Sequence, residues 1–148
     1  KRLTLRPKRY VVEPALVAAA LRLDAAAVLR DGDLLGRLLD SFVVAQLRAE
    51  VPVCESRPRL YHVRDRDGRH EVDIVAELGG GKVIGIEIKA EAAPDRVSAK
   101  HLIWLRDELR ERFLRGVVLH TGPGVYQLAD RIEAAPICAI WGGGGAEE

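Results

Sequence analysis

The spacing of apolar residues predicts two helices in the first third of the chain. The first begins at Glu13-Pro14, because proline is favoured in the first helical turn, and it reaches Leu23. Asp31-Gly32-Asp33 then interrupts the pattern. The second helix runs from Leu34 to Glu50, where apolar residues recur every three or four positions, and Pro52 ends it.

Strand-like segments dominate the rest of the chain. Three follow one another, separated by the turn sequences Asp67-Gly68 and Gly79-Gly80-Gly81 that are typical of hairpins: Arg59–Val63, Glu71–Leu78 and Val83–Ala90. A further helix, a short strand and a last ordered stretch are predicted after them: 94–112, 116–120 and 135–141. The order α-β-β-β-α-β predicts an α/β domain with a mixed central sheet flanked by helices.

Side-chain alternation sets the register of the second and third strands. Alternation places one group of residues on one face of the second strand (Val72, Ile74, Ala76) and another on the opposite face (Glu71, Asp73, Val75). On the third strand, the isoleucines at 84, 86 and 88 share a face. A five-residue loop centred on Gly80 brings the apolar faces to the same side and sets Ile74 opposite Ile86. The same register sets Asp73 opposite Glu87.

Two opposed carboxylates predict a cation site. At a separation of about 5 Å and an effective dielectric near 20, Asp73 and Glu87 would repel each other by roughly 3 kcal/mol. A divalent cation removes this repulsion, and two carboxylates with waters and a substrate phosphate suit Mg²⁺ or Mn²⁺. Lys89, on the face of Glu87, is placed to orient a water nucleophile or to stabilise a phosphoryl group. The alternative is structural: Glu71 pairs with Lys89 across the strands, and both acids are simply solvated.

The ordered motifs resemble a known family. Asp73 followed by Glu87-x-Lys89 on the next strand, after a helix that bears an acidic residue, resembles the PD-(D/E)xK nuclease superfamily. The whole chain is similar to the uncharacterised C-terminal domain of prokaryotic AAA-type ATPases. That similarity rests on six blocks in the family's order: 7–10 with 13–16, 36–43, 71–73, 86–89, 116–122 and 135–141.

The resemblance implies a restriction-endonuclease-like fold and a site for Mg²⁺ or Mn²⁺. Asp73 and Glu87 would be the metal ligands and Lys89 the catalytic lysine. Asp40 falls where the family usually has a glutamate, on a helix that passes over the sheet, and would complete the site. The expected function is a magnesium-dependent nuclease acting on DNA, as the C-terminal module of an AAA-type ATPase. The alternative is a nuclease-like fold without turnover that serves as a DNA- or protein-docking module.

Charge limits how the chain could contact DNA. The 148 residues carry 23 basic and 22 acidic side chains, a net charge of +1, so any nucleic-acid surface must be local. The best candidate for a phosphate-contacting rim is an arginine cluster around the first strand: Arg57, Arg59, Arg64, Arg66 and Arg69. The same arginines are equally typical of an edge strand that charge protects from pairing with other chains.

The remaining features concern organisation. The length suits one compact domain, divided into an N-terminal segment with a short strand and helix (1–33), the nuclease-like core (34–141) and a flexible glycine-rich tail (142–148). The sequence has no methionine, so we expect it to be part of a longer protein whose N-terminal ATPase domain is the partner. The cysteines, Cys54 and Cys138, lack metal-ligand spacing and predict a reduced, cytoplasmic protein. Gly79-Gly80-Gly81-Lys82 lacks the phosphate-loop pattern and predicts a hairpin turn.

Overall fold

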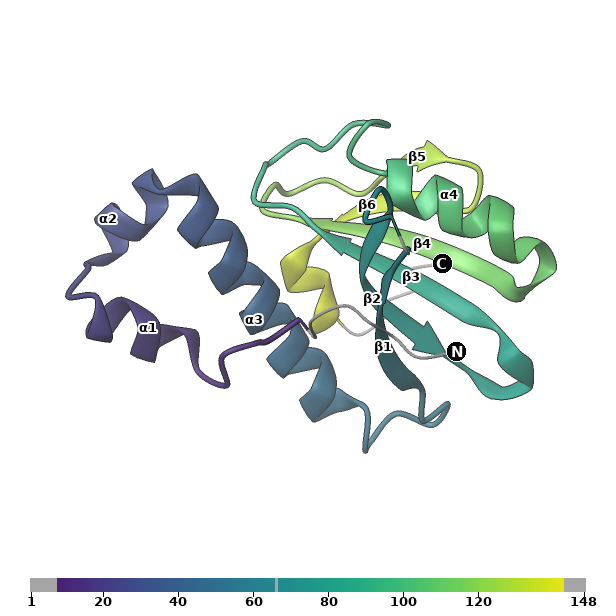
Figure 1. The fold of residues 1–148 in the computed structure, drawn as a ribbon, viewed down its shortest axis with the longest axis horizontal. Helices are drawn as coiled ribbons and strands as arrows, with labels where there is room; N and C mark the ends of the chain where they lie inside the picture. The colour runs from purple at the N-terminus through teal and green to yellow at the C-terminus, as the bar shows by residue number, and fades with distance from the viewer. Residues whose placement is uncertain (1–7, 66, 143–148) are drawn as a thin grey trace.

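The structure, a computed structural model, describes residues 8–65 and 67–142. It is a mixed α/β domain with a six-stranded sheet in the order β1-β2-β3-β4-β6-β5, flanked by helices (Figure 1). The expected α/β class and mixed sheet are therefore confirmed. Two parts of the expected domain division, residues 1–7 and 143–148, lie outside the described residues.

Three helices precede the sheet: α1 (Pro14–Ala20), α2 (Ala25–Arg30) and α3 (Gly32–Glu50). Acidic side chains cap their first turns, at Glu13, Asp24 and Asp31 respectively. The helix expected to reach Leu23 ends earlier, because Arg22 adopts a left-handed φ of 54°. The long helix starts at Gly32, so it crosses the expected domain limit at residue 33. Residues 8–13 form no strand, contrary to the prediction for this segment.

The hairpin of β2 (Glu71–Glu77) and β3 (Val83–Ile88) has the register that the sequence predicts. Ile74 lies opposite Ile86, and the two strands are antiparallel. The turn contains the short helical segment η1 (Gly79–Gly81), in which Gly80 and Gly81 both have positive φ, near 70°. β1 (Arg59–Arg64) pairs with the other side of β2 as an edge strand. The glycine run is thus a hairpin turn, as predicted.

The second half of the sheet has more strands than the sequence analysis predicted. α4 (Lys100–Leu109) and the 3-10 turn η2 (Arg110–Arg112) cross from β3 to the parallel strand β4 (Phe113–His120). Beyond it lie β6 (Ile132–Pro136), parallel to β4, and β5 (Tyr126–Ala129), antiparallel to β6. The 3-10 segment η3 (Ile137–Ile140) follows. These two short strands were missed because each has only four or five residues and Gly122-Pro123-Gly124 precedes them.

The start of α4 also differs from the prediction. Helical spacing suggested a start near Pro94, but residues 94–95 are irregular, residues 96–99 form a turn, and the helix begins at Lys100. The Asp95 carboxylate accepts the backbone N–H groups of Val97 and Ser98, at 2.8 and 3.1 Å. An aspartate that binds backbone N–H groups two and three residues ahead favours a turn over a continuing helix.

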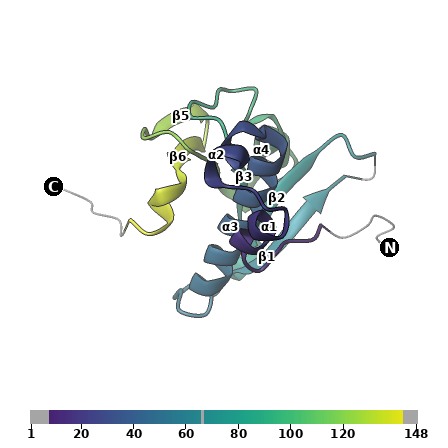
Figure 2. The ribbon, with the colours of Figure 1, turned by 90° about the vertical axis from the view of Figure 1, so that its left-hand side faces the viewer.

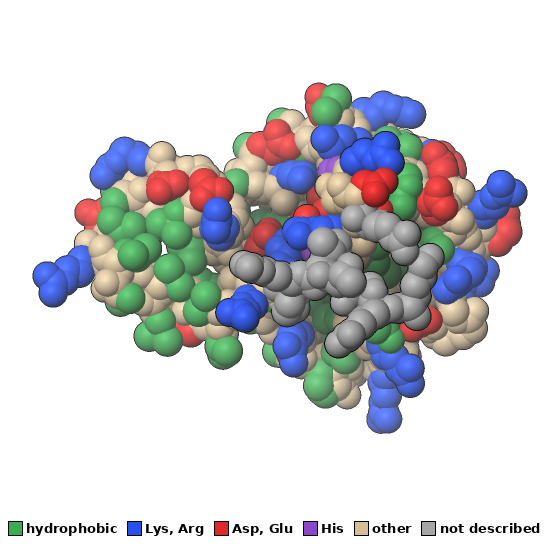
Figure 3. All heavy atoms as spheres, in the orientation of Figure 1, with side chains coloured by type: hydrophobic (Ala, Val, Ile, Leu, Met, Phe, Trp, Pro, Cys, Tyr) green, Lys and Arg blue, Asp and Glu red, His purple; other side chains and the backbone are tan. Residues whose placement is uncertain are grey.

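Two apolar clusters hold the layers together, one on each face of the sheet (Figures 1 and 2). The first packs the sheet against α4 and includes Leu102, Leu105 and Phe113. The second packs it against α3 and η3 and includes Val43, Leu119 and Ile137. The helices α1 and α2 lie beside α3 away from the sheet, and hydrophobic side chains are exposed over them (Figure 3). Among the exposed residues are Leu16 on α1, Leu21 directly after it and Leu29 on α2. None of the helices in the described parts is long and apolar enough to cross a membrane.

The side-chain alternation predicted for β2 is wrong at one point, and the cause is a β-bulge. Tyr61 lies opposite Val75 but Val63 lies opposite Val72, so Asp73 and Ile74 together face the single residue His62. The extra residue reverses the alternation. Val72 therefore packs with Val75 in the α4 cluster, whereas Ile74 packs in the α3 cluster.

Candidate functional site

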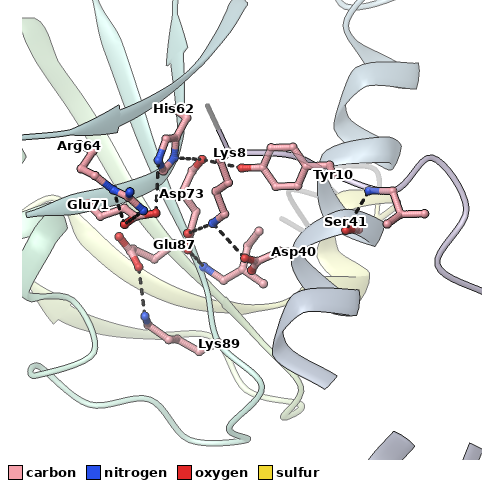
Figure 4. A network of polar contacts seen from close by, with 12 residues as sticks. Lys8, Tyr10, Asp40, Ser41, His62, Arg64, Glu71, Asp73, Glu87 and Lys89 are labelled. Atoms are coloured by element: carbon pink, nitrogen blue, oxygen red, sulfur yellow. Dashed lines mark hydrogen bonds and ion pairs between the residues drawn. The ribbon is translucent and has the colours of Figure 1, made fainter. Parts of the chain in front are cut away.

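The four side chains predicted to be catalytic line one groove. This groove, of about 400 Å³, lies where β2 and β3 separate and the first half of α3 passes nearby. Its lining includes Asp40 from α3, Asp73 from β2, and Glu87 and Lys89 from β3 and the residue after it. Figure 4 shows these side chains gathered at the end of the hairpin pairing, together with Lys8 from the N-terminal segment. Residues separated by up to 81 positions thus meet at one place.

The β-bulge positions Asp73 by freeing its backbone and redirecting its side chain. The Asp73 carbonyl oxygen lies 3.4 Å from the Tyr10 hydroxyl, which donates to it, and 3.3 Å from Nδ1 of His62. The carboxylate Oδ2 accepts the backbone N–H of Ile88 at 3.0 Å, and Oδ1 accepts from the Lys8 ammonium at 2.7 Å. Asp73 is therefore a fixed carboxylate, in contact with β3 and with the N-terminal segment at once.

Glu87 is the most buried charged group of the groove, with only 2% of its surface exposed. Oε2 lies 3.1 Å from the Lys89 ammonium, whereas Oε1 is buried without any hydrogen-bond partner. Burial, together with the negative charge of Asp73, raises the pKa of Glu87 to about 8, although Lys89 acts in the opposite direction. A buried carboxyl oxygen without a partner is energetically costly, so this atom calls for a ligand.

Lys89 remains a cation in this setting. Burial alone lowers the pKa of its ammonium, but the charge of Glu87, its hydrogen bond to Lys89 and the charge of Asp73 together raise the pKa above its ordinary value. A lysine that keeps its proton at neutral pH can donate hydrogen bonds to an anion or a water, but it cannot accept a proton. Its chemical role in the groove is therefore electrostatic.

Asp40 and Asp73 share a second lysine. The Lys8 ammonium lies 2.9 Å from Asp40 Oδ2 and 2.7 Å from Asp73 Oδ1. Burial and the charge of Asp73 raise the pKa of Asp40, against the lowering effect of Lys8. For Lys8 burial lowers the pKa, but the two carboxylates outweigh it and raise the pKa well above its ordinary value. Asp40 on α3 is thus linked to Asp73 on β2 through the ammonium group of Lys8.

Glu71 does not pair with Lys89, so the alternative interpretation, in which these two residues form a cross-strand ion pair, is wrong. Instead Glu71 Oε1 lies 3.2 Å from His62 Nε2, and Oε2 accepts from Arg64 Nε at 2.8 Å. The reason is the pairing of β1 with β2, which sets Arg64 directly opposite Glu71. Lys89 pairs with Glu87 on its own chain segment, two residues away.

The predicted arginine rim is not one continuous surface. Arg57 and Arg59 lie at the start of β1 and line a separate hollow with Glu77, whereas Arg64 lies at the other end of the strand against Glu71. Arg69 pairs with Asp67 at 2.7 Å. Arg66 lies outside the described residues. Of the four rim arginines that the structure describes, Arg57 and Arg59 show no acidic partner among the described residues. Their role in binding DNA stays a prediction.

A comparison with protein families matches residues 35–140 to a domain of unknown function, DUF4143. The chain belongs to this family. DUF4143 domains are found in AAA-ATPase-associated proteins, which agrees with the similarity to a domain of AAA-type ATPases noted from the sequence. No curated protein and no solved structure gives a significant match to the chain. The matched range covers most of α3 and the whole sheet, and it leaves Lys8, α1 and α2 before its first residue.

The groove of this DUF4143 domain fits a metal ion only in part. Within residues 8–65 and 67–142, no group of three or more histidine, cysteine, aspartate and glutamate side chains is arranged to hold one. Asp73 and Glu87 offer carboxylate oxygens of the kind that Mg²⁺ and Mn²⁺ prefer, and Glu87 Oε1 has no other partner. Asp40, the third acid, is engaged with Lys8. The residues therefore fit a metal held by two carboxylates, with water and substrate supplying further ligands.

Sequence reasoning missed several groove residues. Lys8 belongs to a block that supported the family resemblance, yet it was treated only as part of an extended segment. The sequence pattern that could have identified Lys8 is its spacing from Tyr10. Residues two apart share a face of an extended chain, and both side chains contact Asp73. Tyr10 also lies under the Lys8 ammonium, 5.6 Å from ring centre to Nζ. His62 and His101, by contrast, have no pattern in the sequence that marks them as neighbours of the groove.

Proposed function

We propose that this DUF4143 domain is a metal-dependent phosphodiesterase of the PD-(D/E)xK type that cleaves DNA. The observation that supports it best is the buried Glu87, whose Oε1 has no partner, beside Asp73 and Lys89 in one groove. A carboxylate pair on two separating strands, a lysine two residues later and an acidic residue on a covering helix agree with the pattern of that superfamily. A restriction-endonuclease-like fold is part of this proposal.

Asp73 and Glu87 would hold one Mg²⁺ or Mn²⁺ ion. When bound, such an ion lowers the pKa of its water and draws electron density from a phosphoryl oxygen. Lys89 stays protonated and donates hydrogen bonds to the attacking water or to the non-bridging oxygens of the phosphate, where negative charge grows in the transition state. The bulge at Asp73 and the N–H of Ile88 keep the β2 carboxylate oriented toward β3.

DNA is the substrate class that the family resemblance implies. Arg57 and Arg59, which show no acidic partner in the described residues, would contribute sequence-independent phosphate contacts. The association of DUF4143 domains with AAA-ATPases supports an ATPase domain as the partner that delivers or moves the substrate.

A cleavage assay tests the proposal. Single-stranded, duplex and branched DNA are incubated with the protein and Mg²⁺ or Mn²⁺, and RNA serves as a comparison. We expect cleavage by the wild type, none in EDTA, and a loss of at least 100-fold in Lys89→Ala, which removes transition-state charge stabilisation, and in Glu87→Gln, which removes a ligand of the ion. Lys100→Ala, an exposed lysine at the start of α4, is the matched control and should cleave like the wild type.

Two results would overturn the proposal. Cleavage retained by a protein with both Asp73→Ala and Glu87→Ala would show that the nuclease is a contaminant or uses another site. DNA binding without cleavage by the wild type, in the presence of its ATPase partner and either metal, would favour the alternative, a nuclease-like docking module.

A further inference from the structure

Lys8 is held against the acids of the groove by contacts of residues 8–11. Its ammonium lies 2.7 Å from Asp73 Oδ1 and 2.9 Å from Asp40 Oδ2 (Figure 4). The segment is attached to β2 by the Tyr10 hydroxyl, which donates to the Asp73 carbonyl oxygen, and to α3 by the Val11 N–H, which donates to Ser41 Oγ at 3.3 Å. The three side chains of the ion pair are each at most 21% exposed. Lys8 is therefore a fixed part of the groove and not a mobile surface charge.

The positive charges divide the three carboxylates into two sets. Lys8 contacts Asp40 and Asp73, and Lys89 contacts Glu87. Glu87 keeps one oxygen without a partner, so a ligand position remains on that side. On the other side, the ammonium fills the space between Asp40 and Asp73. Two-metal sites need their ions about 3.5–4 Å apart with a carboxylate shared between them, and here the shared carboxylate, Asp73, already has the Lys8 ammonium on its Oδ1.

We propose that Lys8 is a built-in replacement for a second metal ion, so that the groove binds a single divalent cation, at Asp73 and Glu87. This inference rests on the proposed function. Lys8 supplies one positive charge at the position that Asp40 and Asp73 would otherwise offer to a divalent ion. It determines the metal count of the site without being a metal ligand, and it keeps Asp73 oriented when no metal is bound.

Metal stoichiometry tests the inference without any cleavage assay. Binding of Mn²⁺ is followed by the loss of the free-ion electron paramagnetic resonance signal and by titration calorimetry. We expect one Mn²⁺ per chain for the wild type and two for Lys8→Gln, which removes the charge and shortens the side chain by one atom. Lys8→Arg keeps the charge and should bind one. The double variant Lys8→Gln, Asp40→Asn should return to one, because the second ion loses its carboxylate.

Controls separate a specific effect from a general change of charge or folding. Arg9→Gln removes one positive charge from the neighbouring, exposed position and should leave one Mn²⁺ per chain. Circular dichroism of each variant checks that the domain is folded. The Lys8→Arg and double variants keep the comparison valid even if Lys8→Gln lowers stability.

Each other outcome overturns a distinct claim. Two Mn²⁺ ions in the wild type, or one in Lys8→Gln with unchanged affinity, would refute the role of Lys8 while leaving the proposed metal site in place. No Mn²⁺ in any variant would refute the proposed function and the inference with it. Binding to Lys8→Gln alone would mean that Lys8 excludes metal from the native groove, which would overturn both the single-metal count and the proposed function.

Discussion

Replacing Glu87 with glutamine should stabilise the metal-free domain, and increasingly so as the pH rises. Glu87 is 2% exposed, and its pKa in the folded protein is about 8 against an ordinary value of 4.5. The folded protein thus holds this proton more tightly than the unfolded chain does. Raising the pH from 4.5 to 8 therefore favours unfolding of the wild type, because the unfolded chain releases this proton above about pH 4.5 while the folded protein keeps it up to about pH 8.

The magnitude follows from the pKa difference. Each pKa unit corresponds to about 1.4 kcal/mol, so between pH 4.5 and pH 7 the wild type would lose roughly 3 kcal/mol of unfolding free energy relative to Glu87→Gln. This figure already contains the effect of Lys89, whose ammonium lowers the pKa of Glu87. Glutamine has nearly the shape of a protonated glutamate, so the two proteins should be of similar stability near pH 4.5.

Urea unfolding in EDTA measures the effect at pH 5, 6, 7 and 8. The difference in unfolding free energy between Glu87→Gln and the wild type should grow steadily across this range. Glu108→Gln, an exposed carboxylate on α4, serves as the control and should track the wild type. A difference that stays constant with pH, or a variant less stable than the wild type at pH 8, would refute the reasoning that the folded protein holds the Glu87 proton more tightly than the unfolded chain does.

Three further predictions concern the metal and the packing. The apparent affinity for Mn²⁺ should rise up to about tenfold per pH unit between pH 6 and 8, because binding must displace the proton of Glu87, and a flat calorimetric profile would contradict this. Gly85→Ala should lower stability by about 1–3 kcal/mol in urea unfolding, since its Cβ would lie 2.7 Å from Leu102 Cδ2, and Leu102→Ala should relieve part of that cost. Gly36→Ala, inside α3 with no atom within 4 Å of the new Cβ, should raise stability by about 0.5–1 kcal/mol, which a higher melting temperature would reveal.

Local patterns were sufficient for most of the elements that build the groove. The hairpin loop around Gly80 and the isoleucines of β3 determine the register at Ile74 and Ile86, because any slip by one residue would expose an apolar face. That register alone brought Asp73 close to Glu87. The helical spacing of α3 predicted the apolar face that packs on the sheet, whereas the place of Asp40 in the site came from the family resemblance.

Other features depend on contacts between segments that are far apart in the chain. The bulge at Asp73 exists in the pairing of β1 with β2, and no period within β2 itself indicates it. The partner of Glu71 was predicted wrongly for the same reason: β1 places Arg64 opposite it. The strands β5 and β6 are too short for a clear pattern, and they depend on pairing: β6 lies between β4 and β5.

The sequence by itself determined which chemical groups the groove contains, whereas tertiary structure decided how their charges are distributed. Strand alternation is local, so it predicted that Asp73, Glu87 and Lys89 would meet, and the family resemblance added Asp40. Ion pairing acts through space, and Lys8 reaches Asp73 across 65 positions of the chain. Only the folded structure therefore shows that two acids share one lysine, and that the third acid is buried with an oxygen left without a partner.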